Sequence, residues 1–188
     1  SVKMVRIAKE DGVSVSAEVC PHHFAMTEDE IAGDDANYKM NPPLRSAADV
    51  EALVDGLADG TMEAISTDHA PHGEEEKKQS IAKAPFGIVG SETAYALSVT
   101  HLVKTGKLTP LQLVEKMSTN PCRILSVPGG TLSVGAPADI TIADMDSEYV
   151  IDKNTFLSKG KNTPFDGAKV NGRVYYTIVG GNIVYQYE

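Results

Sequence analysis

The segment MEAISTDHAPH, residues 62–72, carries the pattern that decides the fold. Met62–Thr67 is short, apolar and partly β-branched, which is typical of a buried strand. It passes directly into a polar string that begins at Asp68. A second segment, VSVSAEV at residues 13–19, places valines at alternate positions and predicts another strand. It also ends at a polar string, Cys20-Pro21-His22-His23.

Helical patterns separate and surround these two strands. Ser46 is suited to cap a helix that continues to about Asp59, with apolar residues at helical spacing. The order strand, helix, strand implies that the two strands are parallel. Further helices are predicted over residues 1–11, 90–105 and 109–117, and a short one is predicted to begin at Asn120.

The pattern changes from helical to β near Val127. Turn residues follow Gly129, and residues 173–179 and 182–187 predict a hairpin around Gly180-Gly181. We therefore expect one part over residues 1–127 and a second, β-rich part over residues 128–188. Two parallel strands cannot cover their own faces and edges. The chain is thus expected to be an α/β segment of something larger.

Composition excludes several classes of protein. The 188 residues are 41% hydrophobic and 23% charged, and the net charge is −9. This acidic balance argues against a nucleic-acid or anionic membrane partner. No apolar run approaches the roughly 20 residues that a membrane helix needs. Two distant cysteines, Cys20 and Cys122, fit a reduced, cytoplasmic protein.

Asp68 and His72 are the first candidates for chemistry, because they follow a predicted strand at the end where parallel α/β folds bind ligands. A carboxylate and a histidine four residues apart can act as base and electrophile, or as metal ligands. The alternative, in which Asp68 caps the turn and the histidines form local hydrogen bonds, stays equally open.

Other strings offer weaker candidates. Cys20, His22 and His23 have the composition of a zinc site, but adjacent histidines rarely both reach one ion, so packing roles are favoured. Asn41 and Arg45 flank a stiff diproline loop that could read a cyclic amide, or simply satisfy its own backbone.

Two later segments each allow a structural and a functional interpretation. Residues 74–78, EEEKK, predict a solvated loop, with a lid as the alternative. The Phe86-Gly87 backbone could meet an anion, or could simply lead into the following helix.

Five strings occur together in the order and spacing found in one family: AEVCPHHF, YKMNPPLRS, STDHAPHGEEEK, APFGIVGSETA and GTLSVGAPADITI. In these strings the chain, from about Val13 to Val184, resembles the bacterial dihydroorotases with a full-size amidohydrolase barrel. The resemblance implies the C-terminal part of a (β/α)₈ TIM barrel, with strands seven and eight at 13–19 and 62–67. The C-terminal strands of a small β-sandwich would follow, and strands one to six would precede Ser1.

The resemblance also assigns roles residue by residue. Asp68 matches the aspartate that ligates zinc and acts as general base and acid, and Glu18 matches a carboxylate near the metal in some relatives. Asn41 and His72 match substrate-contacting positions, as does the backbone of Phe86 and Gly87. One or two zinc ions per site are implied. The family's other metal ligands have no counterpart in these residues, so this segment alone is expected to be inactive.

The implied reaction is the reversible cyclisation of N-carbamoyl-L-aspartate to L-dihydroorotate in pyrimidine biosynthesis. The implied partners are the small-molecule substrate, the upstream segment of the same protein, a second copy in a homodimer and, in some cases, aspartate carbamoyltransferase. Two alternatives stay open. One is another cyclic-amide hydrolase, namely a hydantoinase, dihydropyrimidinase or allantoinase. The other is a non-catalytic partner of the carbamoyltransferase.

Overall fold

The computed structural model describes residues 1–187. Helices alternate with two short strands in the first two thirds of the chain, and three longer strands follow. The α-helices are α1 (Val2–Glu10), α2 (Pro21–Ala25), α3 (Ala47–Ala58), α4 (Glu74–Lys77), α5 (Ala94–Ser98), α6 (Pro110–Val114) and α7 (Asn120–Leu125). The strands are β1 (Glu18–Val19), β2 (Ala64–Ile65), β3 (Ile140–Val150), β4 (Lys169–Val179) and β5 (Asn182–Gln186). Five-residue π-helical turns are η3 (Val99–Val103) and η4 (Glu115–Thr119), and 3₁₀ turns are η1 (Glu28–Glu30), η2 (Ala36–Tyr38) and η5 (Lys153–Thr155).

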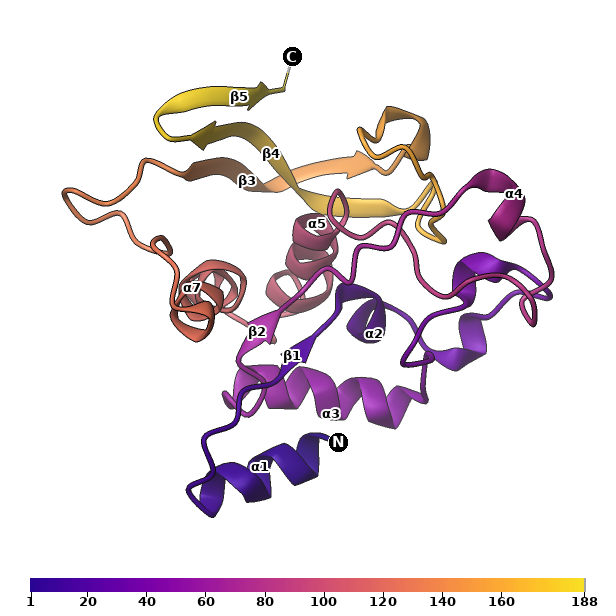
Figure 1. Ribbon diagram of the computed structural model, residues 1–188, viewed down its shortest axis with the longest axis horizontal. Coiled ribbons are helices and arrows are strands. Elements are labelled where there is room, and N and C mark those ends of the chain that lie inside the picture. Colours follow the sequence, from indigo (N-terminus) through magenta and orange to yellow (C-terminus); the bar gives the residue numbers. More distant parts are fainter. Residues whose placement is uncertain (188) are drawn as a thin grey trace.

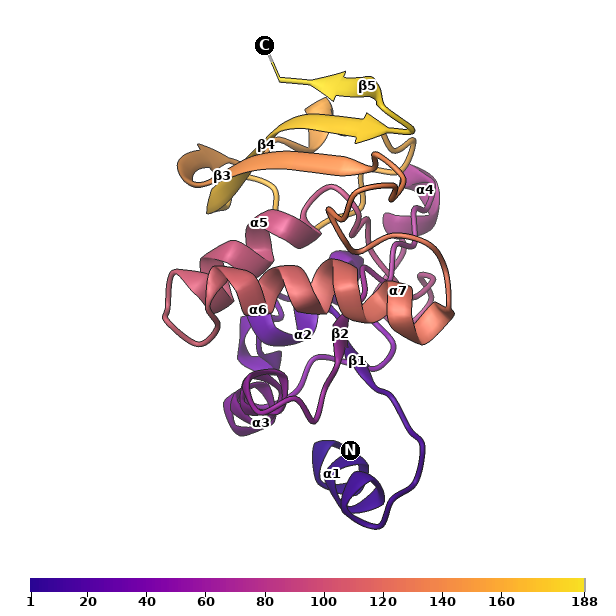
Figure 2. The ribbon, with the colours of Figure 1, turned by 90° about the vertical axis from the view of Figure 1, so that its left-hand side faces the viewer.

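The elements form layers (Figure 1). The three-stranded sheet β3–β4–β5 lies at one end of the molecule and α1 at the other, with α5 between that sheet and the pair β1–β2. The side view shows α6 and α7 passing alongside α5 (Figure 2). In the described residues no helix is long and apolar enough to cross a membrane.

The strands β1 and β2 are parallel, as the order of elements predicted. Glu18 pairs with Ala64 and Val19 with Ile65. The ladder is much shorter than the predicted strands at 13–19 and 62–67, and those lengths were wrong. Within residues 1–187 each of the two strands pairs only with the other, and the pairing ends where the strands diverge. In β1 the side chains alternate, so Glu18 is exposed while Val19 is buried, whereas both residues of β2 are buried.

Most predicted helix boundaries are confirmed, including the cap of α3, where the Ser46 hydroxyl accepts a hydrogen bond from the Asp49 amide. The short helix predicted to begin at Asn120 is confirmed as α7. It is not separated from α6, because the π turn η4 joins the two so that residues 110–125 are helical throughout (Figure 2). Pro121 lacks an N–H and would clash in a regular turn, and a widened turn just before it accommodates the proline. The Asn120 side chain instead donates to the Glu63 carbonyl oxygen at 2.8 Å.

The last three strands form an antiparallel sheet, in which β4 pairs with both β3 and β5. The predicted hairpin is confirmed, with Val179 opposite Asn182 around Gly180-Gly181. The connection from Ser126 to Asp139 contains no helix or strand, and its Leu132 and Val134 side chains are 83% and 107% exposed.

Two apolar clusters meet on α5 and η3. One joins β1, β2, α3 and α6 through Val19, Ile65, Leu57, Val99 and Leu113. The other joins the C-terminal part to α5 and to segments before α5, through residues that include Met40, Leu97, Ile151, Phe165 and Val170. The sheet comes very near here, because a Cβ on Gly172 would lie 2.8 Å from Val99 Cγ2, and Gly172 has a φ of +98°. A side chain at that position would force β4 away from the helix.

The buried side chain of Asn162 forms the polar joint between the two halves of the chain. Its Oδ1 accepts from the His72 amide at 2.9 Å, and its Nδ2 donates to the carbonyl oxygens of Ala70 and Gly87 at 3.0 and 3.2 Å. Its backbone carbonyl accepts from the Val89 amide at 2.9 Å. One residue from the C-terminal part therefore holds two loops that lie 75–92 residues earlier in the sequence.

Asn162→Ala is expected to lower the free energy of unfolding of the full-length protein by about 2–4 kcal/mol, because it leaves the His72 amide and the Ala70 carbonyl without a partner and removes one of the two bonds to the Gly87 carbonyl. Urea titration followed by circular dichroism measures the change. The matched control is Asn154→Ala, since Asn154 is exposed and bonds only within its own turn. A loss no larger than that of the control would show that the joint does not stabilise the fold.

Candidate active site

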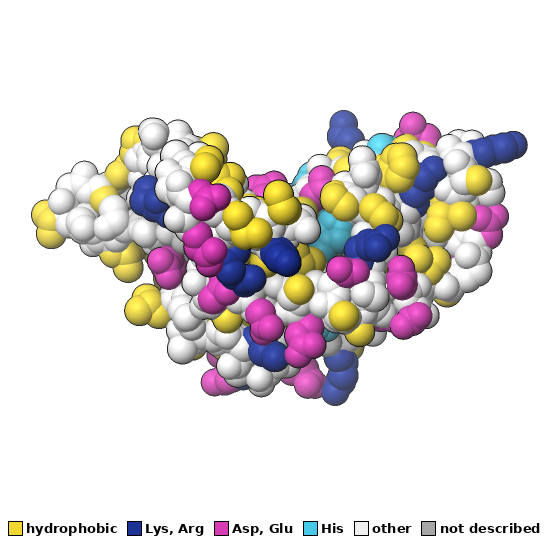
Figure 3. All heavy atoms as spheres, turned by 90° about the horizontal axis from the view of Figure 1, so that it is seen from below, with side chains coloured by type: hydrophobic (Ala, Val, Ile, Leu, Met, Phe, Trp, Pro, Cys, Tyr) yellow, Lys and Arg dark blue, Asp and Glu magenta, His cyan; other side chains and the backbone are white. Residues whose placement is uncertain are grey.

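The loops that follow β1 and β2 meet at the carboxyl ends of the two strands. A single parallel bridge between His69 and Ile88 ties the loop after β2 to the later Phe86–Val89 segment. The Gly87 amide donates to the Lys39 carbonyl oxygen at 2.9 Å, which ties that segment to the diproline loop. The structure thus brings together the three strings that hold Asn41, Asp68–His72 and Phe86-Gly87. Figure 3 shows histidine side chains reaching the surface among charged and hydrophobic groups, beside the hollow between two lobes.

Asp68 lies three residues beyond the end of β2. Its φ of +46° is unusual for a residue other than glycine and sets the direction of the carboxylate. The side chain is 42% exposed, and its Oδ2 lies 3.8 Å from His22 Nε2. A half-exposed carboxylate at a strand end is suited to take a metal ion or a proton.

His22 lies in the first turn of α2, directly after β1, and is 2% exposed. Burial, and then the neighbouring His23, lowers the pKa of His22 to about 3, so the imidazole is neutral at physiological pH. Its Nε2 is buried and makes no hydrogen bond. At 3.8 Å the contact with Asp68 is therefore neither an ion pair at neutral pH nor a formed hydrogen bond.

The other two histidines near Asp68 are held by backbone groups. His69 Nδ1 accepts from the amides of Gly90 and Ser91 at 3.2 and 3.1 Å, which fixes the approach to α5. His72 Nε2 donates to the Phe86 carbonyl oxygen at 2.8 Å, and its Nδ1 lies 3.9 Å from a Glu76 carboxylate oxygen. His69 thus has the local structural role that the sequence left open, whereas His72 lies between two of the loops.

The diproline loop is exposed at Asn41, Pro42 and Pro43 and anchored by the buried Leu44. His23 Nε2 donates to the Pro42 carbonyl oxygen at 2.8 Å, so the helix after β1 supports this loop. The Asn41 amide is available to solvent on the same group of loops as Asp68.

The Phe86-Gly87 segment is tightly bonded through its backbone. Gly87 has a φ of +106°, and a Cβ there would lie 2.4 Å from the Ala70 Cβ, so only glycine allows the two loops to approach this closely. Its amide already donates to Lys39, and its carbonyl accepts from Asn162 and Lys77. The Phe86 ring is 55% exposed.

The side chains of Lys39 and Lys77 contact the segment around Phe86-Gly87. Lys77 Nζ donates to the carbonyl oxygens of Pro85 and Gly87 at 3.2 and 2.9 Å, and burial lowers its pKa. The solvated loop predicted over residues 74–78 is therefore wrong, because α4 forms there and turns Lys77 inward. Lys39 Nζ donates hydrogen bonds to the carbonyl oxygens of Ala82 and Ala84, and it lies 4.6 Å from the centre of the Phe86 ring.

Cys20, His22 and His23 come close enough to hold a metal ion, with one ligand atom of each within 4.8 Å of the others. Burial raises the pKa of the Cys20 thiol to about 11, although the Ser66 hydroxyl acts in the opposite direction. His23 is committed to Pro42. A protonated thiol and an engaged histidine are poor zinc ligands, which agrees with the packing roles favoured from the sequence.

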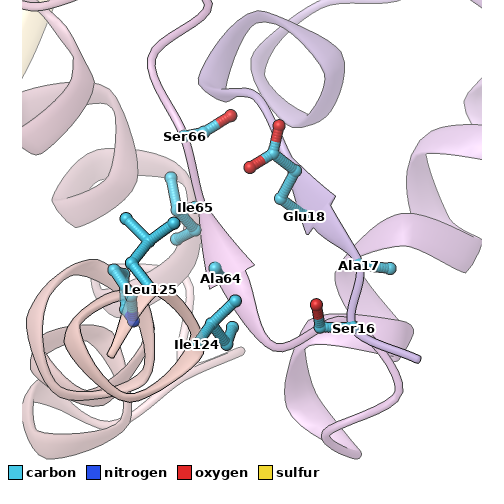
Figure 4. A pocket seen from close by; sticks show the side chains of 9 residues that line it. Ser16, Ala17, Glu18, Ala64, Ile65, Ser66, Ile124 and Leu125 are labelled. Carbon is cyan, nitrogen blue, oxygen red and sulfur yellow. The ribbon is translucent and has the colours of Figure 1, made fainter. Parts of the chain in front are cut away.

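A pocket of about 280 Å³ lies on the open face of β1 and β2 (Figure 4). The side chains of Glu18 and Ser66 point toward one another at its upper end, and Ile124 and Leu125 of α7 close one side. Ser66 lines this pocket, but Asp68 does not. Glu18 is thus a neighbour of the loop cluster and contributes no direct bond to it.

Sequence reasoning missed Asn162 and Lys77, the two side chains that hold the loops in place. Asn162 lies 75–92 residues from the backbone groups that its side chain binds, and Lys77 lies 8–10 residues from its partners. Neither residue stands in a spacing that predicts such contacts. The string Asn162-Thr163-Pro164-Phe165, in which a polar pair precedes a turn and a buried ring, was the one available signal.

Comparison with known proteins adds family membership to this geometry. The model of the amidohydrolase family matches residues 2–184. Curated relatives named dihydroorotase are 56% identical in Bacillus licheniformis, 55% in Pelotomaculum thermopropionicum and 53% in Bacillus subtilis, each over 186 residues. These matches cover 99% of this chain and 44% of each relative, so the chain spans less than half the length of these proteins.

Solved structures agree on the fold. The L-hydantoinase (dihydropyrimidinase) of Arthrobacter aurescens is 33% identical with a TM-score of 0.89, and the dihydropyrimidinase of Brevibacillus agri is 26% identical with a TM-score of 0.91. Both comparisons cover 98% of this chain and 42% of the other. These likenesses support the barrel fold of the amidohydrolases for the larger α/β part. The chain therefore belongs to the amidohydrolase family.

Proposed function

We propose that the protein containing this chain is a dihydroorotase, which interconverts N-carbamoyl-L-aspartate and L-dihydroorotate with loss or gain of water. The observation that carries the proposal is the identity of 52–56% to eight relatives of that name, over nearly the whole chain. The hydantoinases and dihydropyrimidinases are similar at only 26–33% identity. The cluster of Asn41, Asp68 and His72 supports a hydrolytic site rather than a non-catalytic scaffold.

We further propose that β1 and β2 are strands seven and eight of the barrel. The parallel pairing and the polar loops at the carboxyl ends of both strands support this, since barrel enzymes build their sites there. The part from 128 onward is proposed to be the C-terminal share of a small β-sandwich. Its exposed apolar side chains, Ile142, Ile183 and Val184, suit a sheet that other strands cover in the full-length protein.

Asp68 fits the role of a zinc ligand, because its carboxylate is half exposed and forms no hydrogen bond within residues 1–187. A catalytic zinc usually takes three protein ligands, so the rest of the full-length protein is proposed to supply the others. A zinc ion bound there would polarise the ring amide and lower the pKa of water.

The residues of this chain would then divide the work of hydrolysis. Asp68 accepts the proton of the attacking water and returns it to the ring nitrogen as the C–N bond breaks. Asn41 offers an amide donor and acceptor to the cyclic amide. His72 orients the substrate from the loop that also carries Asp68, and the exposed Phe86 forms part of the wall of the site. In the full-length protein the partners are the small-molecule substrate and a second copy of the protein.

Asp68→Asn in the full-length enzyme is expected to reduce kcat by at least about 10²–10⁴-fold, because the amide cannot accept the proton. Spectrophotometric assay of dihydroorotate measures the loss. The control is Asp55→Asn, since Asp55 is exposed on α3. Residual turnover above a few per cent, with the fold intact, would exclude Asp68 as the base.

His72→Asn is expected to raise KM and lower kcat while leaving zinc content unchanged, because His72 contacts the substrate and braces Phe86. Steady-state kinetics and metal analysis by mass spectrometry separate these effects. Loss of zinc from this variant would instead make His72 a ligand.

The isolated segment 1–188 is expected to show no dihydroorotase activity and to bind zinc poorly at Asp68, since one carboxylate cannot hold a catalytic ion. Assay and equilibrium dialysis of the expressed segment, beside the full-length enzyme, check this. Turnover by the segment would contradict the proposed ligand set. Turnover of hydantoin but not dihydroorotate by the full-length enzyme would instead favour the hydantoinase alternative.

A further inference from the structure

His22 carries an unpaired buried nitrogen next to the proposed base. Three side-chain polar atoms are buried without a hydrogen bond in residues 1–187, and the other two are oxygens, of Asn37 and Glu63. His22 Nε2 is thus the one that can donate. The nearest acidic oxygen is Asp68 Oδ2, at 3.8 Å. Native structures rarely leave a buried N–H unpaired, so an unpaired one requires an explanation.

The surrounding structure fixes where this ring points. Pro21 occupies the first turn of α2, directly after β1, and the His22 ring packs against His23 at 4.2 Å between centroids. His23 is in turn held by its bond to Pro42. The His22 ring is 2% exposed, whereas the Asp68 side chain is 42% exposed and has no other side-chain contact within hydrogen-bond distance in the described residues. The carboxylate is therefore the partner that is free to rotate.

We propose that His22 is a positioning residue for Asp68, and that the His22 imidazole donates its Nε2 proton to Asp68 Oδ2 in the working enzyme. This inference rests on the proposed function, in which Asp68 is the base. A rotation of the carboxylate shortens the gap, and catalytic hydrogen bonds are often long before the substrate complex forms. The bond engages Oδ2 and leaves Oδ1 available to the reacting groups.

Such a bond has a chemical consequence for the base. Groups that hydrogen-bond a ligating or catalytic side chain fix its orientation, and their loss typically reduces activity or metal affinity by about 10–100-fold. Because the His22 ring is buried and packs against His23, it can hold Asp68 Oδ2 in one direction.

The kinetic test compares two amides at one position. The amide nitrogen of Gln reaches where His Nε2 lies, whereas that of Asn reaches only to Nδ1. In the full-length enzyme, His22→Asn is expected to lower kcat by about 10–100-fold with KM changed less than about twofold. His22→Gln is expected to recover most of that loss. The control is His101→Gln, which replaces a partly buried histidine on η3.

Equal kcat values for the Gln and Asn variants would overturn the proposal. So would losses of kcat that correlate with the melting temperatures of the variants, because they would then reflect instability of the fold. An inactive wild type, or an active Asp68→Asn variant, would instead reject the proposed function.

A second measurement does not depend on activity. ¹⁵N NMR of the imidazoles in the metal-free full-length protein is expected to show His22 as the Nε2–H tautomer, with a resonance that moves in Asp68→Asn. The Nδ1–H tautomer, or a resonance indifferent to that substitution, would overturn the inference. Metal titration of the same sample tests the competing arrangement, because an ion bound by Cys20, His22 and His23 would remove the Nε2 proton and also overturn it.

Discussion

The hydrogen bonds of the Asn162 amide are the constraint on which the arrangement of the loops depends. The ladder between β1 and β2 contains two residue pairs, so regular pairing does little to position the loops beyond the strands. The loop after β2 and the Phe86–Val89 segment are instead joined through one buried side chain from the C-terminal part. All polar atoms of that amide are used, which makes its orientation unambiguous. The candidate site is thereby supported by both parts of the chain.

The four histidines near Asp68 have different hydrogen-bonding roles, because their surroundings differ. His69 accepts two backbone protons, while His23 and His72 each donate one to a carbonyl oxygen. His22 has no such partner and faces a carboxylate. The rings of His23, His69 and His72 therefore hold loops in place through hydrogen bonds, whereas the His22 ring packs against His23. Chemistry near Asp68 depends on this division of roles.

The sequence predicted those features of the fold that depend on interactions between residues close together in the chain. The Ser46 cap, the strand–helix–strand order and the glycine hairpin follow from backbone hydrogen bonding and side-chain period within a few residues, and the structure contains each. The predicted strand lengths were wrong, because a neighbour in space determines where pairing stops. The joining of α6 to α7 was not predicted, because it depends on a widened turn that accommodates Pro121. Asn162 and Lys77 could not be predicted, since their partners are set by how distant segments pack.

The close approach of β4 to the helix at Gly172 bears on how the chain tolerates being cut. The connection from Ser126 to Asp139 is exposed and free of regular structure, so a protease would reach it before the packed elements. A break there removes the covalent link but none of the contacts among Gly172, Val99 and Tyr95, nor the bonds of Asn162. The two pieces would remain associated as a nicked protein, and the same position is a natural place for new termini in a circular permutant.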